Sequence, residues 1–328
     1  MTARAARVVV MMIRPPVAVV ILLFAAIGMA QAGRGDALHP LFTVVPLILA
    51  GWFVNATVLN DLGDEAVDRV NLADARGRPL VSGDATRAEL QALGRMAAAA
   101  SVAAALAVNW RVAAVVAGGL LLNVAYSVRP LRLCDRGMLA PLVLPAGFVA
   151  LPYLVGLLTV QPSVGREDAL LLAAMYVTFV GRIMLKDFRD VRGDAMFGKR
   201  TFLVRHGREA TCRLSAVLWT AGTAGLLLVL PRRPLLVAAL AALLGCTLHG
   251  LRRLVATSGR VAEQVVIGAI AQTGRGTAIL LLAHLTMVGK GWSDPAQALV
   301  VVTLTLLYAG LYAATLSEGD RVLAIRPY

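Results

Sequence analysis

Stretches of about twenty apolar residues recur along the whole chain, and a membrane-spanning α-helix needs a stretch of about this length. Ten of them can be read, near residues 16–33, 41–60, 89–108, 111–127, 138–159, 168–186, 211–230, 234–251, 264–289 and 295–316. The ninth is the most interrupted, because "QTGRG" (272–276) places Arg275 and two glycines inside it. We therefore predict an all-α, polytopic transmembrane helical bundle of nine or ten helices.

The composition supports this class. Hydrophobic residues make up 59% of the 328 residues and charged residues only 16%, whereas soluble domains carry about 25% charged residues. Aromatic residues contribute 5%, and Ala, Val, Leu and Gly fill the apolar stretches. This pattern favours helices packed through small residues over a β-barrel.

The N-terminal segment allows two interpretations. Arg4, Arg7 and Arg14 precede a hydrophobic stretch that ends in "AQA" (30–32), a pattern that also occurs in cleavable signal peptides. Many further spans follow and need no cleaved leader. We therefore expect the first span to be retained.

The basic residues predict the orientation in the membrane, because Lys and Arg concentrate in cytoplasmic loops. Placing the N-terminus inside puts most of the 32 Lys and Arg residues on one side. The loops at 61–88, 128–137, 187–210 and 252–263 are then cytoplasmic, and the protein is a multi-pass protein of the cell inner or plasma membrane. The net charge of +13 largely reflects this bias, so we expect no nucleic-acid partner. Arg95, Arg182 and Arg275 are exceptions that fall within spans.

Several common functional sites have no basis in the sequence. Cys134, Cys212 and Cys246 form no C-x-x-C pair, and the four histidines are dispersed. Zinc, disulfide and haem sites are therefore not indicated. No P-loop, G-x-G-x-x-G or G-x-S-x-G motif is present either, which argues against the usual nucleotide and hydrolase sites.

A first acidic cluster, "NDLGDEAVDR" (60–69), follows the second apolar stretch. Asn60, Asp64 and Asp68 are spaced by four, and on a helix each such step turns the side chain by only about 40°. These three side chains are therefore predicted to share one face. Asp61 lies on a neighbouring face and is an accessory candidate.

A second acidic cluster lies in "KDFRDVRGDAMFGKRT" (186–201), again after an apolar stretch and in a loop predicted to be cytoplasmic. Asp187, Asp190 and Asp194 are spaced by three and four, which also keeps them on one helical face. Two acidic faces are thus predicted at the same membrane surface.

Clusters of this kind suit divalent cations, because like charges at helical spacing repel unless a cation neutralises them. Magnesium prefers oxygen ligands and is commonly held by carboxylates together with substrate phosphates. Either cluster alone could be a solvated helix end. Two clusters on one side, in a chain with only 19 Asp and Glu, indicate metal ions held around a phosphorylated ligand.

Basic residues that could contact phosphate lie in the same loops. The candidates are Arg69, Arg78, Arg129, Arg132, Lys186, Lys199 and Arg200. Each one alone is also explained by the orientation bias. Arg132, Lys186 and Arg200 are preferred because they lie nearest to the patterned segments.

Three segments together resemble the signatures of the UbiA superfamily of intramembrane prenyltransferases. "NDLGDEAVDR" followed by "GRPLVSG" (77–83) is similar to the first signature, N-D-x-x-D-x-x-x-D and then R-P-x-x-x-G. "YSVRPLRL" (126–133) looks like the family's Y-S-x-x-P-L-R-L loop. "KDFRDVRGD" (186–194) resembles its second signature, in the form seen in the homogentisate and chlorophyll prenyltransferase branches. The motifs cover roughly residues 50 to 210.

The resemblance implies one transmembrane prenyltransferase domain over residues 1–328, with motif loops at 60–83, 126–137 and 186–207. Its helices would surround a central cavity that opens to lipid. Two Mg²⁺ ions are implied, which would bridge the aspartate motifs to a prenyl diphosphate. Asn60, Asp64 and Asp68 would hold one ion, and Asp190 and Asp194 the other, with Asp61 and Asp187 as accessories.

The sequence departs from the family pattern at two positions. Both changes affect the expected choice of acceptor and leave the metal-binding acids in place. Cys134 stands where many relatives have Lys, and Arg192 stands where the second signature often has Glu.

The implied reaction is transfer of a prenyl group, through an allylic carbocation, to a hydrophobic or aromatic acceptor within the bilayer. The acids Asp64, Asp68, Asp190 and Asp194 would assist ionisation of the diphosphate. Tyr126 and Asn123 lie three residues apart on one helix face. Tyr126 is a catalytic candidate and Asn123 an acceptor-binding candidate, although packing roles explain both.

Two other functions remain open. A terpene cyclase on the same scaffold would begin with the same ionisation step, and the motifs do not separate it from a transferase. A transporter of cations or phosphorylated solutes is less favoured, because transporter sites lie near the bilayer midplane, whereas these acids lie at the ends of spans.

Overall fold

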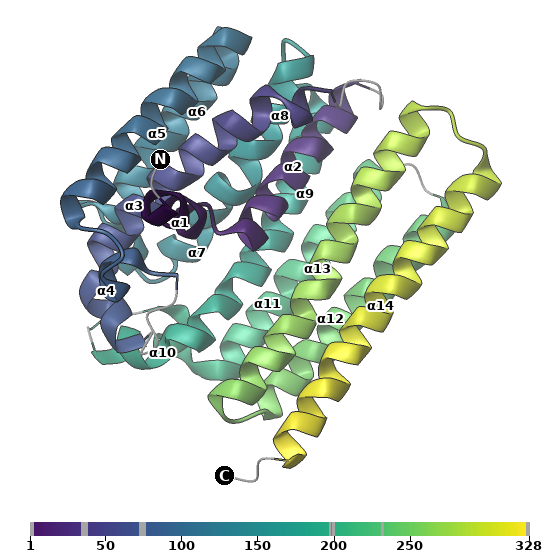
Figure 1. Ribbon diagram of the computed structural model, residues 1–328. Coiled ribbons are helices and arrows are strands. Elements are labelled where there is room, and N and C mark those ends of the chain that lie inside the picture. The colour runs from purple at the N-terminus through teal and green to yellow at the C-terminus, as the bar shows by residue number, and fades with distance from the viewer. Residues whose placement is uncertain are drawn as a thin grey trace. The chain divides into compact units, whose positions relative to one another are not determined.

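The computed structural model describes residues 3–33, 39–71, 77–196, 198, 201–230 and 233–325, and the side chains in these ranges except those of 70, 71, 190, 192–195 and 320–325. Every regular element in these ranges is a helix (Figure 1). The all-α prediction is therefore confirmed.

Ten helical segments are long and apolar enough to cross a membrane. They are Pro15–Gly33, Val44–Arg69, Arg87–Val108, Trp110–Ser127, Leu139–Val160, Arg166–Arg189, Phe202–Val229, Pro234–Ala256, Arg260–Gly289 and Asp294–Gly319. Each overlaps one apolar stretch of the sequence. The interrupted ninth stretch is a continuous helix, so the larger of the two predicted counts applies to the described residues.

The chain divides into two compact units. One comprises residues 1–164 and 192–201, and the other residues 165–191 and 202–328. The helices of the first unit are α1 (Ala3–Ile13), α2 (Pro15–Gly33), η1 (His39–Phe42), α3 (Val44–Asn71), α4 (Pro79–Ser82), α5 (Arg87–Val108), α6 (Trp110–Ser127), η2 (Leu133–Asp135), α7 (Leu139–Pro145), the π-helical turn η3 (Ala146–Ala150) and α8 (Leu151–Val160).

Local signals set the boundaries between these helices. Thr86 and Glu89 form a reciprocal capping box at the start of α5, with the Thr86 N–H donating to Glu89 Oε2 at 2.7 Å. Asn109 separates α5 from α6, and its Oδ1 accepts from the Val112 N–H at 2.9 Å. Such side chains satisfy the free N–H groups of a helix start.

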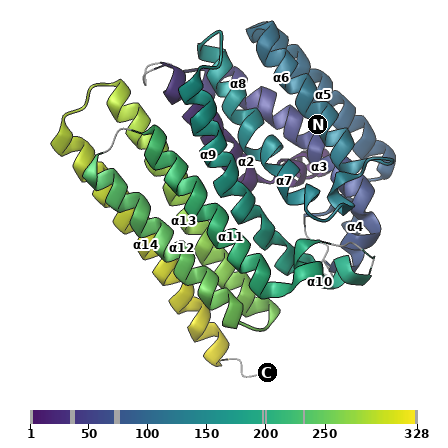
Figure 2. The same cartoon turned by 180° about the vertical axis from the view of Figure 1, so that it is seen from behind.

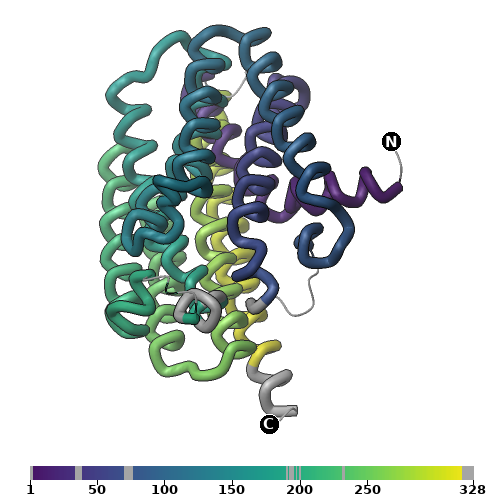
Figure 3. The backbone as a smooth tube through the Cα atoms, turned by 90° about the vertical axis from the view of Figure 1, so that its left-hand side faces the viewer, coloured from purple at the N-terminus to yellow at the C-terminus, as the bar shows by residue number. Residues whose placement is uncertain are grey.

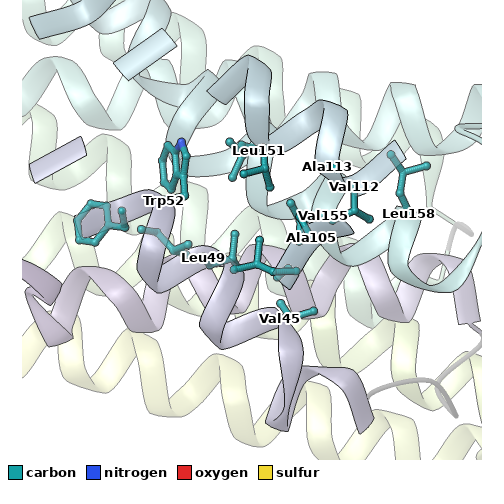
Figure 4. Packing of buried hydrophobic residues seen from close by; sticks show 14 of the residues in the cluster. Val45, Leu49, Trp52, Ala105, Val112, Ala113, Leu151, Val155 and Leu158 are labelled. Carbon is teal, nitrogen blue, oxygen red and sulfur yellow. The ribbon is translucent and has the colours of Figure 1, made fainter. Parts of the chain in front are cut away.

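Apolar side chains of α2, α3, α5, α6 and α8 form the core of the first unit. Leu49 and Trp52 of α3, Val112 of α6 and Val155 of α8 lie in it (Figure 4). Helices α2 and α8 approach closely, because a Cβ at Gly156 would overlap the Ala25 carbonyl group. This explains why small residues are so common in the apolar stretches.

The short helix α1 differs from the spans of its unit. It runs across their direction (Figure 3) and packs on α3 through Val8 and Met12. Thr57 of α3 donates its hydroxyl to the Met12 carbonyl at 2.9 Å. This contact fixes the end of α1 beside the middle of α3 and brings Arg14 toward the acidic end of α3.

The second unit contains α9 (Arg166–Ile183), η4 (Met184–Lys186), the start of α10 (Asp187–Met196), α11 (Phe202–Val229), α12 (Pro234–Ala256), α13 (Arg260–Gly289) and α14 (Asp294–Ile325). Helices α9, α11, α12, α13 and α14 lie side by side (Figure 2). Within α11 the backbone bends at Gly207, whose φ of 77° is a left-handed value that glycine adopts readily. The bend falls just before residue 211, where the sequence predicted the span to begin.

Candidate active site

The C-terminal part of α3 carries the first acidic cluster. As predicted, Asn60, Asp64 and Asp68 lie on one face, and the Asn60 amide donates to Asp64 Oδ2 at 2.8 Å. Asp68 is buried and Asp64 is half-buried. The stripe therefore lies at the end of a span and is covered by other parts of the first unit.

Arg132 of the "YSVRPLRL" segment covers part of this stripe. Its guanidinium donates to Asp64 Oδ1 at 2.7 Å and to the Gly63 carbonyl at 3.0 Å, and it also bonds Asp135. Gly63 is needed for this approach, because a Cβ there would lie 2.7 Å from Arg132 Nη1. Two of the three sequence signatures thus meet at one ion pair.

The backbone and the charge of Arg132 are both set by this contact. Its φ is 36°, in the left-handed region that residues with a side chain rarely adopt. Partial burial alone would lower the pKa of Arg132, but the hydrogen bond to Asp135 and the neighbouring charges of Cys134 and Asp64 outweigh burial and raise that pKa. The residue remains a cation, held in an uncommon conformation by its carboxylate partners.

Asp61 lies beside the stripe and is almost completely buried, with 2% of its surface exposed. Arg14, which lies between α1 and α2, donates to Asp61 Oδ1 at 2.8 Å, and Arg78 bonds the same oxygen. Arg78 also places its Nε 3.1 Å from Asp68 Oδ2. One half-buried guanidinium therefore joins two carboxylates that are seven positions apart on α3.

Glu65 points away from the stripe. It pairs with Arg69 at 3.0 Å and with Arg87 of α5 at 2.5 Å. Arg69, a candidate phosphate contact, lies exposed on this other side of α3. The structure therefore separates Arg69 from Arg78 and Arg132.

The sequence did not single out two groups at this site, Arg14 and Asp135. A carboxylate oxygen of Asp64, the sulfur of Cys134 and a carboxylate oxygen of Asp135 lie within 4.8 Å of one another. The Cys134 thiol is buried. Arg14 resembled any basic residue before a first span, and only the fold of α1 against α3 brings it to Asp61. Asp135 and Asp64 are far apart in the sequence, and no local sequence pattern indicates that they lie close together.

The donor set on α3 suits a hard divalent cation. Asn60, Asp64 and Asp68 present an amide and two carboxylates on one face, and such oxygen ligands are those that magnesium prefers. Cys134 adds a softer sulfur ligand beside Asp64, which would favour thiophilic metals instead.

The second acidic cluster is described only in part. Helix α10 spans Asp187–Met196, so positions 187, 190 and 194 share a helical face by register. Asp187 is buried, and Lys186 Nζ lies 2.9 Å from its Oδ1. The side chains of Asp190, Arg192 and Asp194, and the whole of Lys199 and Arg200, lie outside the described residues.

Asn123 and Tyr126 lie on α6. The Asn123 amide is buried and donates to the Trp52 carbonyl at 3.3 Å and to Asn55 Oδ1 at 3.1 Å. Tyr126 is half-buried one turn further along. Asn123 therefore links α6 to the part of α3 that precedes the acidic stripe, which is the interhelical bonding that buried Asn residues commonly provide.

Known proteins share both the sequence pattern and the fold. The chain is 29% identical to the bacteriochlorophyll synthase 34 kDa chain of Chloroflexus aurantiacus, over 51% of this chain and 52% of that protein. It is 32% identical to digeranylgeranylglyceryl phosphate synthase of Methanoculleus marisnigri, over 57% of this chain and 64% of that protein. These alignments thus span about half to two thirds of the relatives.

Solved structures agree at the level of fold. A UbiA homologue from Archaeoglobus fulgidus, bound to DMAPP and Mg²⁺, superposes with a TM-score of 0.59 at 17% identity, covering 94% of this chain and 99% of that one. The sequence model of the UbiA prenyltransferase family matches residues 19–267. With ten helices able to span a bilayer, the chain is an integral membrane protein, and it belongs to the UbiA prenyltransferase family.

Proposed function

We propose that this protein is a magnesium-dependent prenyltransferase that moves a prenyl group from a prenyl diphosphate to a hydrophobic, aromatic acceptor inside the membrane. The observation that carries the proposal is the contact between the acidic stripe of α3 and Arg132. It places carboxylates for a metal and a cation for phosphate at the same end of a span. The fold shared with a UbiA homologue bound to DMAPP and Mg²⁺ supports it.

We assign the metal-binding groups by motif. Asn60, Asp64 and Asp68 would hold one Mg²⁺ ion, and Asp190 and Asp194 a second, with Asp187 as an accessory. Bound magnesium would neutralise the charge that develops on the departing diphosphate. Asp61 bonds Arg14 and Arg78, so we assign it the role of orienting Arg78.

The basic residues bind and orient the diphosphate. Arg78 and Arg132 are held in place by carboxylates of α3, so their donor groups are already oriented at the site where the phosphate oxygens would lie. Bidentate Arg contacts suit phosphate and strengthen as its charge grows during ionisation. Lys186, Lys199 and Arg200 of the second motif bind the same diphosphate. Arg69 attracts it electrostatically from a greater distance.

The remaining chemistry requires that water be excluded from the allylic carbocation. Apolar spans provide such an environment and also accommodate the prenyl chain. The π-electrons of the acceptor form the new C–C bond to the cation, and the displaced ring proton leaves to a base. We assign Tyr126 the role of orienting the acceptor, and Asn123 would support the position of α6 through the bonds to α3.

The basic loops favour a cytoplasmic location for the N-terminus and the motif loops, in a cell inner or plasma membrane. We further propose that residues 1–328 act as a single catalytic domain, because the motif segments fall in both compact units.

Product analysis tests the function. The purified protein would be incubated with Mg²⁺ and dimethylallyl, geranyl, farnesyl or geranylgeranyl diphosphate, with and without aromatic acceptors, and the products identified by mass spectrometry. We expect prenylated acceptor that depends on both substrates. A hydrocarbon or alcohol formed without acceptor would instead identify a terpene cyclase, and the absence of diphosphate release under every condition would refute both reactions.

A further inference from the structure

Arg208 of α11 has no part in the reaction described above, yet it connects several elements of the second unit. Its guanidinium donates to the Glu263 carboxylate, to the Leu254 carbonyl at 3.0 Å and to the Thr257 carbonyl. Leu254 and Thr257 lie at the end of α12, and Glu263 lies in the first turn of α13. One guanidinium therefore ties α11 to both sides of the connection between α12 and α13.

The same guanidinium lies over the ring of Phe188, with its Cζ 5.4 Å from the ring centre. Phe188 is the second residue of α10 and directly follows Asp187. It is 3% exposed and belongs to an apolar cluster that also contains Cys212 and Leu254. A guanidinium stacks favourably on an aromatic face. Arg208 therefore braces the side chain that anchors the start of α10 to the second unit.

The position of Phe188 on α10 gives this contact its importance. Positions 187, 190 and 194 share one face of α10 by register, and each residue of a helix is turned by about 100° from the one before it. Phe188 therefore lies off the acidic face, where it packs on the apolar cluster together with Val191. Because Phe188 fixes the rotation of α10 about its own axis, it also fixes the direction in which the acidic face points.

The hydrogen bonds hold the Arg208 guanidinium in one orientation. Glu263 is buried and Arg208 is half-buried, and a charge-assisted bond in such a place is stronger than one in water. Arg213, further along α11, pairs with Glu209, but both side chains are exposed, and exposed pairs contribute little. Arg208 is therefore a fixed support for Phe188, whereas Arg213 is an ordinary surface residue of the same helix.

We propose that Arg208 is a positioning residue for the metal site of the second acidic motif: it holds Phe188 in place, and through Phe188 it orients the acidic face of α10. This inference rests on the proposed function, which assigns Asp190 and Asp194 to a Mg²⁺ ion. Residues that orient metal ligands without touching the metal commonly contribute about tenfold or more to metal affinity. Arg208 acts in this way through an aromatic ring, from the side of α10 that carries Phe188.

Metal binding tests this role without any substrate. Mn²⁺ can replace Mg²⁺ as a probe, and EPR spectroscopy of the free ion would follow its titration into the purified full-length protein in phosphatidylcholine nanodiscs. Every variant would also carry Asp64→Ala, so that the titration reports the second motif. We expect Arg208→Gln to weaken Mn²⁺ binding about tenfold. In the protein that retains Asp64, Arg208→Gln should raise the Mg²⁺ concentration for half-maximal activity by about the same factor, with a much smaller change in kcat at saturating Mg²⁺.

A double-mutant cycle shows whether Arg208 acts through Phe188. Phe188→Leu keeps an apolar side chain but removes the ring face, and it should also weaken Mn²⁺ binding. Adding Arg208→Gln to Phe188→Leu should then change the affinity by about twofold or less, because both substitutions remove one shared contact.

Matched controls separate positioning from folding. Arg213→Gln removes the exposed arginine of the same helix and should leave Mn²⁺ affinity within about twofold. Asp190→Ala should abolish the binding and so show that it occurs at the second motif. Glu263→Gln takes the carboxylate partner from Arg208 with little change in size. It should weaken Mn²⁺ binding less than Arg208→Gln does, and it provides the test if Arg208→Gln does not fold.

The unfavourable outcomes differ from one another. Unchanged Mn²⁺ affinity in Arg208→Gln and Glu263→Gln would overturn the positioning role, as would equal losses in Arg208→Gln and Arg213→Gln. Losses that multiply in the double variant would overturn the route through Phe188. A wild-type protein that binds Mn²⁺ but releases diphosphate from no prenyl diphosphate would refute the proposed function and leave the positioning role standing, because the titration contains no substrate.

Discussion

The Arg132 guanidinium donates to the Asp64 carboxylate at 2.7 Å, although the two residues are 68 positions apart in the chain. The same guanidinium bonds Asp135 and the Gly63 carbonyl. The contact joins the first acidic motif to the loop after α6 and orients a phosphate-binding group beside the proposed metal ligands.

Replacing Arg132 tests this relationship. Arg132→Lys keeps the charge but loses the forked donor geometry, and we expect kcat/KM for the prenyl diphosphate to fall about 100-fold, or about 2.7 kcal/mol of transition-state stabilisation. Steady-state kinetics on the purified enzyme would measure it. Arg136→Lys, in the same loop, serves as the control, because within the described part of the chain Arg136 donates to backbone carbonyls. An equal loss in both variants would argue against a specific role.

Asp61 is predicted to contribute mainly to stability and to the position of Arg78. Asp61→Ala leaves Arg14 and Arg78 without their shared buried carboxylate, and breaking such a buried pair costs about 3 kcal/mol or more. Thermal unfolding in detergent would show a lower midpoint. Glu65→Ala removes only partly exposed pairs, so a comparable loss of stability there would contradict the distinction.

Metal removal tests the oxygen donor set on α3. Treatment with EDTA should abolish diphosphate release, and added Mg²⁺ should restore it. Asp64→Ala and Asp68→Ala should each lower kcat by at least about 100-fold, because a lost metal ligand weakens neutralisation of the leaving group. Asp84→Ala is a suitable control, since among the described residues the Asp84 carboxylate bonds Ser82, while Arg4 donates to the Asp84 backbone carbonyl. Full activity in EDTA would exclude metal dependence.

The close approach of α2 and α8 leads us to predict that a larger residue at Gly156 destabilises the protein. A side chain at Gly156 would overlap the Ala25 carbonyl group, so Gly156→Ala should force the helices apart and cost about 2 kcal/mol. Gly118 on α6 has open space around its Cα, and Gly118→Ala should be neutral or slightly stabilising. Thermal unfolding of the two variants compares them, and equal midpoints would show that the contact tolerates expansion.

Hydropathy predicted the spans well, because each helix that crosses a membrane needs a long apolar stretch of its own. This requirement is local and can be read from the sequence. Helical spacing also predicted correctly that Asn60 and Asp64 would share one face, where the structure joins them by a hydrogen bond. The ninth span was harder, since Arg275 lowers the local hydropathy, yet the helix continues through it and Arg275 bonds Gln272 of the same helix.

The sequence did not predict which charged residues far apart in the chain would pair with each other. The partners of Asp61 come from the boundary of α1 and α2 and from the segment before α4, and no local spacing encodes such a meeting. Arg14 looked like an ordinary basic residue before a span, and Arg78 and Arg132 were candidate phosphate contacts whose carboxylate partners the sequence did not indicate. Their burial against carboxylates distinguishes them from Arg69, and this burial depends on the packing of α1 and of the loop after α6.

The arginines on the acidic face have one further consequence, because Arg14, Arg78 and Arg132 already pair with the carboxylates of Asp61, Asp64 and Asp68. A divalent ion that binds these carboxylates must therefore exchange with guanidinium groups rather than fill an uncompensated site. Each displaced guanidinium stays tethered nearby and becomes available to an anion. Binding of the metal should then raise the affinity of the protein for diphosphate, and binding of diphosphate should raise its affinity for the metal by the same factor.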